Sequence, residues 1–151
     1  MRIAVGCDHG GFSLKFTVLN SISSSDHEVI DFGTDNGEES VDFPDFVFKV
    51  CDAIQRGVAD RGIIICGSGV GASIAANKMK GIFAGLCHDH YSAHQGVEHD
   101  HMNVLCMGAR VIGPAIAEEL TKAFLSAVEN HDERFDRRMG KVRKLEEFGH
   151  L

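Results

Sequence analysis

Short apolar runs alternate along the chain with segments whose apolar residues recur at helical spacing. The runs predict strands, and the segments between them predict helices, because an amphipathic helix repeats every 3.6 residues. Strands are predicted at residues 3–6, 28–32, 62–66, 82–87 and 104–108. Helices are predicted at residues 12–24, 44–55, 72–78, from about 91, 114–130 and 133–148.

This alternation predicts an α/β fold, a doubly wound, Rossmann-like sheet of five parallel strands with helices on both faces. Neither a repeat nor a linker interrupts the pattern, so residues 1–151 are predicted to form a single domain that ends in a charged helix. The spacing also predicts which side chains of the first two helices face the core: Phe12, Phe16, Leu19 and Ile22, then Phe46, Val47, Val50 and Ile54.

Charge and cysteine content narrow the classes of function. The net charge of −7 argues against nonspecific binding to nucleic acid or to an anionic membrane. An anionic ligand would need a local basic pocket, and six of the 15 Lys and Arg residues follow His131. We expect no membrane helix, no signal peptide and no disulfide framework, since the five cysteines form no CxxC pair. A cytoplasmic protein is predicted.

The most informative segment follows the third predicted strand. In a doubly wound sheet the ligand lies beyond the carboxyl ends of the strands. Cys66 ends that strand, and the loop Gly67-Ser68-Gly69-Val70-Gly71 leads into a helix. Such a loop directs several backbone N–H groups at an anion, and these amides favour a thiolate at Cys66. The pattern indicates a base beside an oxyanion hole, although a small buried thiol fits the strand end equally.

Three other patterns leave alternatives open. Gly67, Gly69 and Ala72 fit the dinucleotide pattern G-x-G-x-x-G/A, with Asp89 as the ribose-binding acid, but the chain has no room for a substrate domain. Asp8 and His9 follow the first strand and suit a sugar or a phosphate, unless Asp8 caps the next helix. His90 and His94 would share a helix face, as in a zinc site, but the spacing within the group matches neither HExxH nor a zinc finger, so no metal is predicted. The group consists of His88, His90, His94, His99 and His101.

In order along the chain, seven segments resemble signature segments of the ribose-5-phosphate isomerase B family, and the likeness extends from Ile3 to about Val142. The segments are Gly6–Phe12, Asp42–Asp45, Ile65–Gly71, Ser73–Lys78, Tyr91–Ala93, Glu98-His99 with Asn103–Leu105, and Gly108–Gly113.

The resemblance implies the interconversion of D-ribose 5-phosphate and D-ribulose 5-phosphate in the non-oxidative pentose phosphate pathway, without a cofactor or a metal. It implies a homodimer or homotetramer whose active site is shared between subunits. A hexose 6-phosphate substrate (allose or galactose) and a non-catalytic sugar-phosphate sensor stay open.

Roles also follow from the resemblance. Cys66 takes the proton from C2 and returns it to C1, Ser68 moves protons between O1 and O2, and His99 opens the furanose ring. The remaining residues bind substrate: the amides of Gly67, Gly69, Val70 and Gly71 hold the enediolate, Asp8 and Phe43 contact the sugar, and His9, Arg110, Arg134 and Arg138 hold the phosphate.

The chain departs from the family pattern at three positions. Ser68 replaces the usual Thr and keeps the hydroxyl, whereas Phe43 replaces a common Tyr and loses one. Asp100 replaces an Asn that donates a hydrogen bond to the substrate, which an ionised carboxylate cannot do. We expect that Asp100 turns away, is protonated, or is compensated by a neighbour such as His101.

Overall fold

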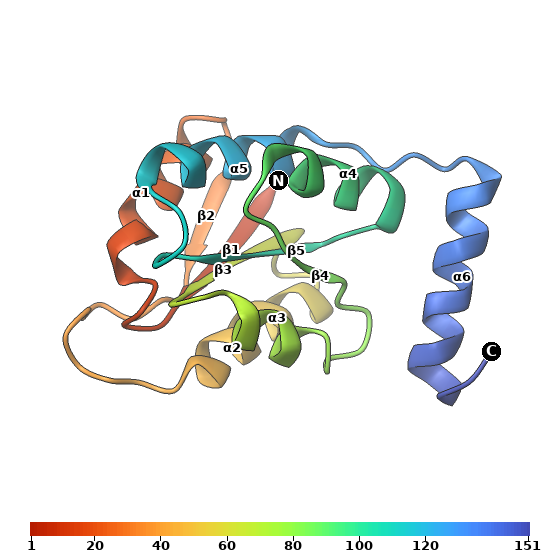
Figure 1. The fold of residues 1–151 in the computed structure, drawn as a ribbon, viewed down its shortest axis with the longest axis horizontal. Coiled ribbons are helices and arrows are strands. Elements are labelled where there is room, and N and C mark those ends of the chain that lie inside the picture. Colours follow the sequence, from red (N-terminus) through yellow and green to blue (C-terminus); the bar gives the residue numbers. More distant parts are fainter.

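The computed structural model of residues 1–151 contains one five-stranded parallel sheet between two layers of helices (Figure 1). The predicted fold class is confirmed. In spatial order the strands are β2 (Glu28–Asp31), β1 (Arg2–Cys7), β3 (Arg61–Cys66), β5 (Val104–Gly108) and β4 (Ala84–Leu86). The helices are α1 (Phe12–Ser23), α2 (Phe43–Gln55), α3 (Val70–Ala76), α4 (His90–Asp100), α5 (Pro114–Ser126) and α6 (Glu133–Phe148).

The two faces of the sheet carry separate cores because successive strand residues point to opposite sides. Ile63 and Ile65 of β3 pack with residues of α1, α4 and α5. Ile64 and Cys66 pack with residues of α2 and α3. Helices on each face of an all-parallel sheet explain why β3 is apolar throughout. None of the helices has the length and the apolar composition needed to cross a lipid bilayer.

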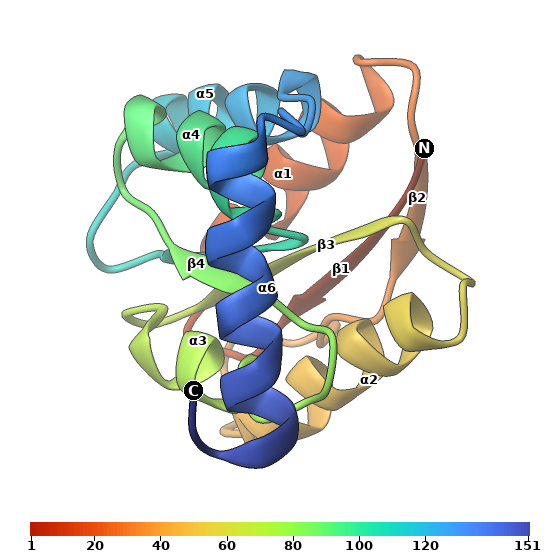
Figure 2. The same ribbon diagram turned by 90° about the vertical axis from the view of Figure 1, so that its right-hand side faces the viewer.

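Helix α6 lies at one end of the molecule, outside the two helix layers (Figures 1 and 2). Its first turns are anchored by Phe135 and Met139, both of which are buried. Farther along, the Arg143 guanidinium lies 5.6 Å from the centre of the Phe83 ring, and Glu146 accepts a 2.8 Å hydrogen bond from the Gly81 N–H. The helix spans residues 133–148, as predicted.

The predicted core face of α1 is only partly right. Phe16 is 61 % exposed, whereas Leu14, Lys15 and Val18 are buried together with Ile22. The prediction follows the apolar residues alone. One position of the buried face of α1 is occupied by a lysine, so the apolar residues do not reveal which face is buried. In α2, Val47 and Val50 are buried as predicted, and Phe46 and Ile54 are partly buried.

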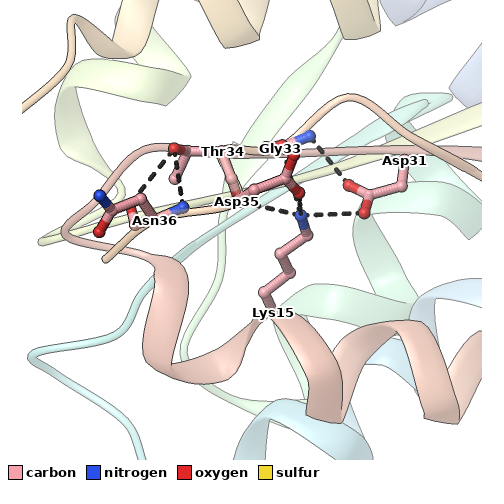
Figure 3. Close-up of polar contacts among 6 residues, drawn as sticks. All are labelled: Lys15, Asp31, Gly33, Thr34, Asp35 and Asn36. Atoms are coloured by element: carbon pink, nitrogen blue, oxygen red, sulfur yellow. Dashed lines mark hydrogen bonds and ion pairs between the residues drawn. The ribbon is translucent and has the colours of Figure 1, made fainter. Parts of the chain in front are cut away.

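Lys15 is buried because a polar cluster surrounds its ammonium group (Figure 3). Lys15 Nζ lies 2.9 Å from Asp31 Oδ2, 2.9 Å from the Thr34 carbonyl and 3.3 Å from Asp35 Oδ1. Burial alone would lower the pKa of Lys15, but the hydrogen bonds to Asp31 and Asp35 outweigh burial and raise it. The cluster therefore fixes the start of the loop that leads from β2 to Phe43.

Two predicted elements are shorter in the structure. Helix α5 ends at Ser126 rather than residue 130, because Arg61 donates to the carbonyls of Phe124 (2.5 Å) and Ala127 (2.9 Å) and so satisfies the helix end. Strand β4 covers residues 84–86 rather than 82–87, since the Asn103 side chain accepts the hydrogen bond of the Phe83 N–H at 2.8 Å.

Candidate active site

A cavity of about 340 Å³ lies where the strand order reverses, between the carboxyl ends of β1 and β3. The chain runs from β1 outward to β2 and from β3 toward the opposite edge, and such a crevice is the usual ligand site of a doubly wound sheet. Ten residues line the cavity: Asp8, His9, Gly10, Phe43, Cys66, Gly67, Ser68, Gly71, Arg110 and Val111. Eight of them are predicted site residues, and Gly10 and Val111 are their chain neighbours.

Cys66 is the one cysteine that lines this cavity. Its sulfur accepts a hydrogen bond of 3.0 Å from the Gly69 N–H, a bond that a thiolate accepts more strongly than a thiol. Among the other cysteines, burial raises the pKa of the Cys7, Cys51 and Cys87 thiols to about 11. Those three thiols are protonated at neutral pH, so the chemistry of the cavity belongs to Cys66.

The glycine loop after Cys66 offers fewer amides to a ligand than predicted. The Gly69 N–H is taken by Cys66, and the Val70 N–H donates to Ser68 Oγ at 3.3 Å. Gly69 and Val70 also do not line the cavity, whereas the N–H groups of Gly67 and Ser68 make no intramolecular hydrogen bond. Gly71 lines the cavity too, and its N–H likewise makes no intramolecular hydrogen bond, so these three amides are the donors available for an oxyanion.

Asp8 and His9 are held by backbone contacts at the other wall. The Gly11 N–H donates to Asp8 Oδ1 at 2.9 Å, but Gly11 itself is the cap of α1, so the alternative role of Asp8 as helix cap is wrong. The second carboxylate oxygen of Asp8 has no hydrogen-bond partner in the chain. His9 Nδ1 accepts the Val41 N–H at 3.2 Å, which places the proton of the neutral ring on Nε2 as a donor.

Phe43 packs closely against Gly71, and Arg110 lies in ordinary contact distance of Gly67. A Cβ on Gly71 would lie 2.8 Å from Phe43 Cζ, and one on Gly67 would lie 3.5 Å from Arg110 Nε. Arg110 forms no ion pair, so its charge is free for an anion. We call the residues of this cavity and its loop the strand-end group: Asp8, His9, Phe43, Cys66–Gly71 and Arg110.

The other predicted residues lie at the opposite end of the sheet. His99 and Asp100 precede β5, while Cys66 ends β3 and pairs with Gly108 at the far end of β5. At about 3.3 Å per residue, the five residues of β5 separate the two positions by roughly 16 Å. His99, Asp100, Arg134 and Arg138, here called the helix group, therefore do not reach Cys66 of the same chain.

The helix group gathers around one aromatic ring. The His99 ring stacks on Phe135 with centroids 4.0 Å apart, and the Arg134 guanidinium lies 4.6 Å from the same ring. Asp100 is exposed and accepts a 3.1 Å hydrogen bond from Gln95 Nε2. The neighbouring His101 contacts Glu129 and Asp136, and the three expectations for Asp100 toward a substrate stay predictions.

The sequence profile of the ribose/galactose isomerase family matches residues 3–142. The chain belongs to this family. It is 44 % identical over 126 residues to ribose-5-phosphate isomerase B of Escherichia coli, covering 83 % of this chain and 84 % of the relative. It is 39 % identical over 127 residues to a D-erythrulose-4-phosphate isomerase of Pectobacterium atrosepticum, with 84 % of each chain covered.

Solved structures agree with these relatives. The ribose-5-phosphate isomerase B of Clostridium thermocellum superimposes with a TM-score of 0.92 at 44 % identity, covering 97 % of this chain and 98 % of that one. The similarity therefore extends over nearly the whole fold, including α6.

In this chain the glycine loop leads into α3, with Gly69 as its N-cap. The dinucleotide alternative loses its support. Asp89 caps α4 by accepting the Ser92 N–H at 2.8 Å, and the strand before it, β4, is separated from β3 by β5.

The histidine group is spread over several places. His90 and His94 do share a helix face, with rings 6.4 Å apart, while His88 Nε2 accepts the Gly108 N–H at 3.0 Å. The five histidines thus do not converge on one site.

Proposed function

We propose that this protein is an aldose–ketose isomerase that interconverts D-ribose 5-phosphate and D-ribulose 5-phosphate, a reaction of the non-oxidative pentose phosphate pathway. The observation that carries the proposal is Cys66 in a cavity beside the unpaired N–H groups of Gly67 and Ser68. Membership of the ribose/galactose isomerase family and the similarity to ribose-5-phosphate isomerase B support it. With its cysteines all free thiols, we place the protein in the cytoplasm.

The proposed reaction needs only a base and an oxyanion hole. The Cys66 thiolate removes the proton from C2 of the open-chain aldose, and the electron pair of that bond forms the C1–C2 double bond. The carbonyl oxygen O1 becomes the oxyanion, which the N–H groups of Gly67 and Ser68 stabilise. Ser68 Oγ passes the O2 proton to O1. The ketone then forms at C2, and Cys66 returns its proton to C1.

The same cavity supplies groups for the two ends of the sugar phosphate. The free oxygen of Asp8 suits a sugar hydroxyl, and Phe43 offers an apolar wall. At the other end, His9 Nε2–H and Arg110 are donors for the phosphate. The net charge of −7 would by itself repel an anionic substrate, and the positive charge of Arg110 in the cavity offsets this repulsion locally.

We also propose that the active site is completed by a second subunit, in a homodimer or homotetramer. His99 would open the furanose ring and Arg134 and Arg138 would bind the phosphate, but none reaches the cavity of its own chain. Beside that cavity, Val70 and Ile74 occupy one face of α3 and are 48 % and 59 % exposed. An exposed apolar face at the rim suits a partner subunit that brings its own helix group.

The first experiment is turnover of ribose 5-phosphate by EDTA-treated protein without any cofactor, compared with the Cys66→Ala variant. We expect native turnover, and a loss of about 10²–10⁴-fold in the variant with substrate binding kept. Equal turnover by both proteins would remove Cys66 as the base. Binding without turnover by the native protein would favour the sensor. No activity on this pentose would lead to hexose 6-phosphates and to D-erythrulose 4-phosphate, which a relative isomerises.

The shared site is tested by mixing two inactive chains. Cys66→Ala and His99→Gln are co-expressed with different tags, and the mixed dimers are purified through both. Each mixed dimer contains one intact site and one doubly damaged site, so the purified mixed dimers should show about half of the activity of the native dimer. Mixed dimers without activity would place both residues in one chain and contradict the shared site.

A further inference from the structure

A second cluster of chemically active side chains lies away from the cavity, where α4, α5 and α6 meet. His101 follows α4 in a left-handed conformation (φ 52°), His131 belongs to the segment between α5 and α6, and Asp136 lies in the first turn of α6. One nitrogen or oxygen atom from each residue lies within 4.8 Å of the other two. The three residues are separated by up to 35 positions in sequence, so only the fold brings them together.

The spacing of these atoms matches a metal site. His101 Nε2 lies 3.3 Å from Asp136 Oδ1, and His131 Nδ1 lies 3.2 Å from the same oxygen. Tetrahedral bonds of about 2.0–2.1 Å to nitrogen and oxygen place neighbouring ligand atoms about 3.3 Å apart. The two histidine nitrogens lie within 4.8 Å of each other, and the His131 side chain is 66 % exposed.

His101 gives an independent reason to expect a ligand here. Its side chain is only 8 % exposed, and its Nε2 is a buried polar atom without a hydrogen bond in the structure. A buried nitrogen that makes no hydrogen bond destabilises the fold, and a bound ion would remove this cost. The same atom faces the carboxylate of Asp136 at the position where a ligand atom is needed.

Two further charged groups face this histidine pair. Arg143 Nη2 lies 3.0 Å from His101 Nδ1, and Glu129 Oε2 lies 3.8 Å from the same nitrogen and 3.7 Å from His131 Nε2. A metal on Nε2 requires a proton on Nδ1, which Glu129 is placed to accept and which Arg143 must vacate. Arg143 also lies 5.6 Å from the centre of the Phe83 ring, a second contact that does not depend on His101.

We infer that His101, His131 and Asp136 bind one divalent transition metal ion of the zinc class, with water at the fourth position and Glu129 as the acceptor for the histidine N–H groups. Two imidazoles and one carboxylate are donors that zinc prefers, and the exposure of His131 and Asp136 leaves room for the water. The ion would join the end of α4 to the start of α6. This site is separate from Cys66 and lies next to the helix group, since His101 is two residues from His99 and Asp136 follows Phe135.

The test uses the full-length protein, stripped with EDTA and titrated with Co²⁺ while the visible ligand-field absorption is recorded. We expect one Co²⁺ per chain, displaced by Zn²⁺, and no thiolate charge-transfer band. His131→Gln and Asp136→Asn should weaken binding by about tenfold or more. Both residues are exposed, so these variants should fold even if substitution of the buried His101 does not.

The matched control is His94→Gln, which removes a histidine that also faces a carboxylate, Glu98, at 3.6 Å. It should bind Co²⁺ like the native protein. The thermal midpoint of native protein and of His94→Gln should rise with Zn²⁺ concentration, and that of His131→Gln should not. The inference is overturned if the native protein binds no Co²⁺, if His131→Gln and Asp136→Asn bind it as tightly, if His94→Gln abolishes binding, or if a thiolate band shows that cysteines hold the metal.

Discussion

The strand-end group and the helix group differ in how the chain holds them. In the strand-end group, backbone N–H groups fix Cys66, Asp8 and His9, and the loops are so closely packed that glycines are needed. In the helix group, Arg134 and Arg138 are exposed on α6, and their carrier helix lies outside the sheet layers (Figure 2). The first group is therefore complete within one chain, whereas the second would act, under the proposed shared site, on the cavity of a partner subunit.

The largest effect on kcat/KM is expected from Gly69→Ala, which displaces the glycine loop within the strand-end group. Gly69 has φ +80°, and a Cβ there would lie 2.4 Å from Leu86 Cδ1 and 2.9 Å from the Met107 carbonyl carbon. The loop must move, and its N–H then leaves the Cys66 sulfur. We expect kcat/KM for ribose 5-phosphate to fall by about 10²–10³-fold, the effect of losing an aligned donor.

Gly57→Ala is the control, because Gly57 has φ +66° but no atom within 4 Å of the added Cβ. Gly57→Ala places an alanine in the left-handed backbone region but causes no steric clash. We expect the free energy of unfolding to fall by about 1 kcal/mol and kcat/KM to stay unchanged. If Gly69→Ala keeps native kcat/KM while folded, the loop geometry is not what activates Cys66.

A smaller effect is expected from Arg138→Ala in the helix group. Arg138 forms no ion pair in the chain and is exposed, so its removal should leave the thermal midpoint unchanged. A lost charge-assisted bond to phosphate, about 1.5–3 kcal/mol, should raise KM about 10–100-fold with a smaller change in kcat. Arg137→Ala, on a different face of α6, should change neither. Equal effects of the two variants would indicate general electrostatics rather than a phosphate ligand.

The same contrast explains how far the sequence predicts this molecule. Strand runs, the Cys66 glycine loop and the Asp8-His9 loop are local patterns, and the sheet topology alone brings them together, so they are predictable. The end of α5 is not, because it depends on Arg61, which lies 63 positions before Phe124. The contact between His101 and His131 is not predictable either. It depends on the turn after α4 and on the path of the segment between α5 and α6, neither of which the spacing of the histidines reveals.

Lys15→Met tests whether the polar cluster in Figure 3 holds the loop that positions Phe43 of the strand-end group. The substitution keeps the stem of the side chain and removes the ammonium group that joins Asp31, Thr34 and Asp35. Because Asp35 is fully exposed and regains water, we expect a loss of only about 1–3 kcal/mol in the free energy of unfolding. The loop that carries Phe43 should loosen and raise KM slightly.

The pH dependence gives the sign of the Lys15 contribution. Its pKa is raised in the folded state, so its stabilisation is fully present below the ordinary lysine value of about 10.4 and is lost as pH rises through the raised pKa. Urea unfolding of native and Lys15→Met proteins should therefore differ by a constant amount from pH 6 to about pH 10 and converge only above it. A difference that disappears near pH 7 would contradict the ion-pair account.

The smallest effect is expected from Asp100→Asn, which restores the family's usual residue to the helix group. Asp100 accepts the Gln95 amide at 3.1 Å, and an Asn side chain keeps an acceptor for that bond while adding a donor. It also removes a negative charge that would repel the enediolate of the partner's site. We expect kcat/KM to stay equal or to rise, with Asp100→Ala as the control that lacks the donor. A fall of about 100-fold or more in Asp100→Asn, the size of a lost acid or base, would show that the carboxylate itself takes part in the reaction.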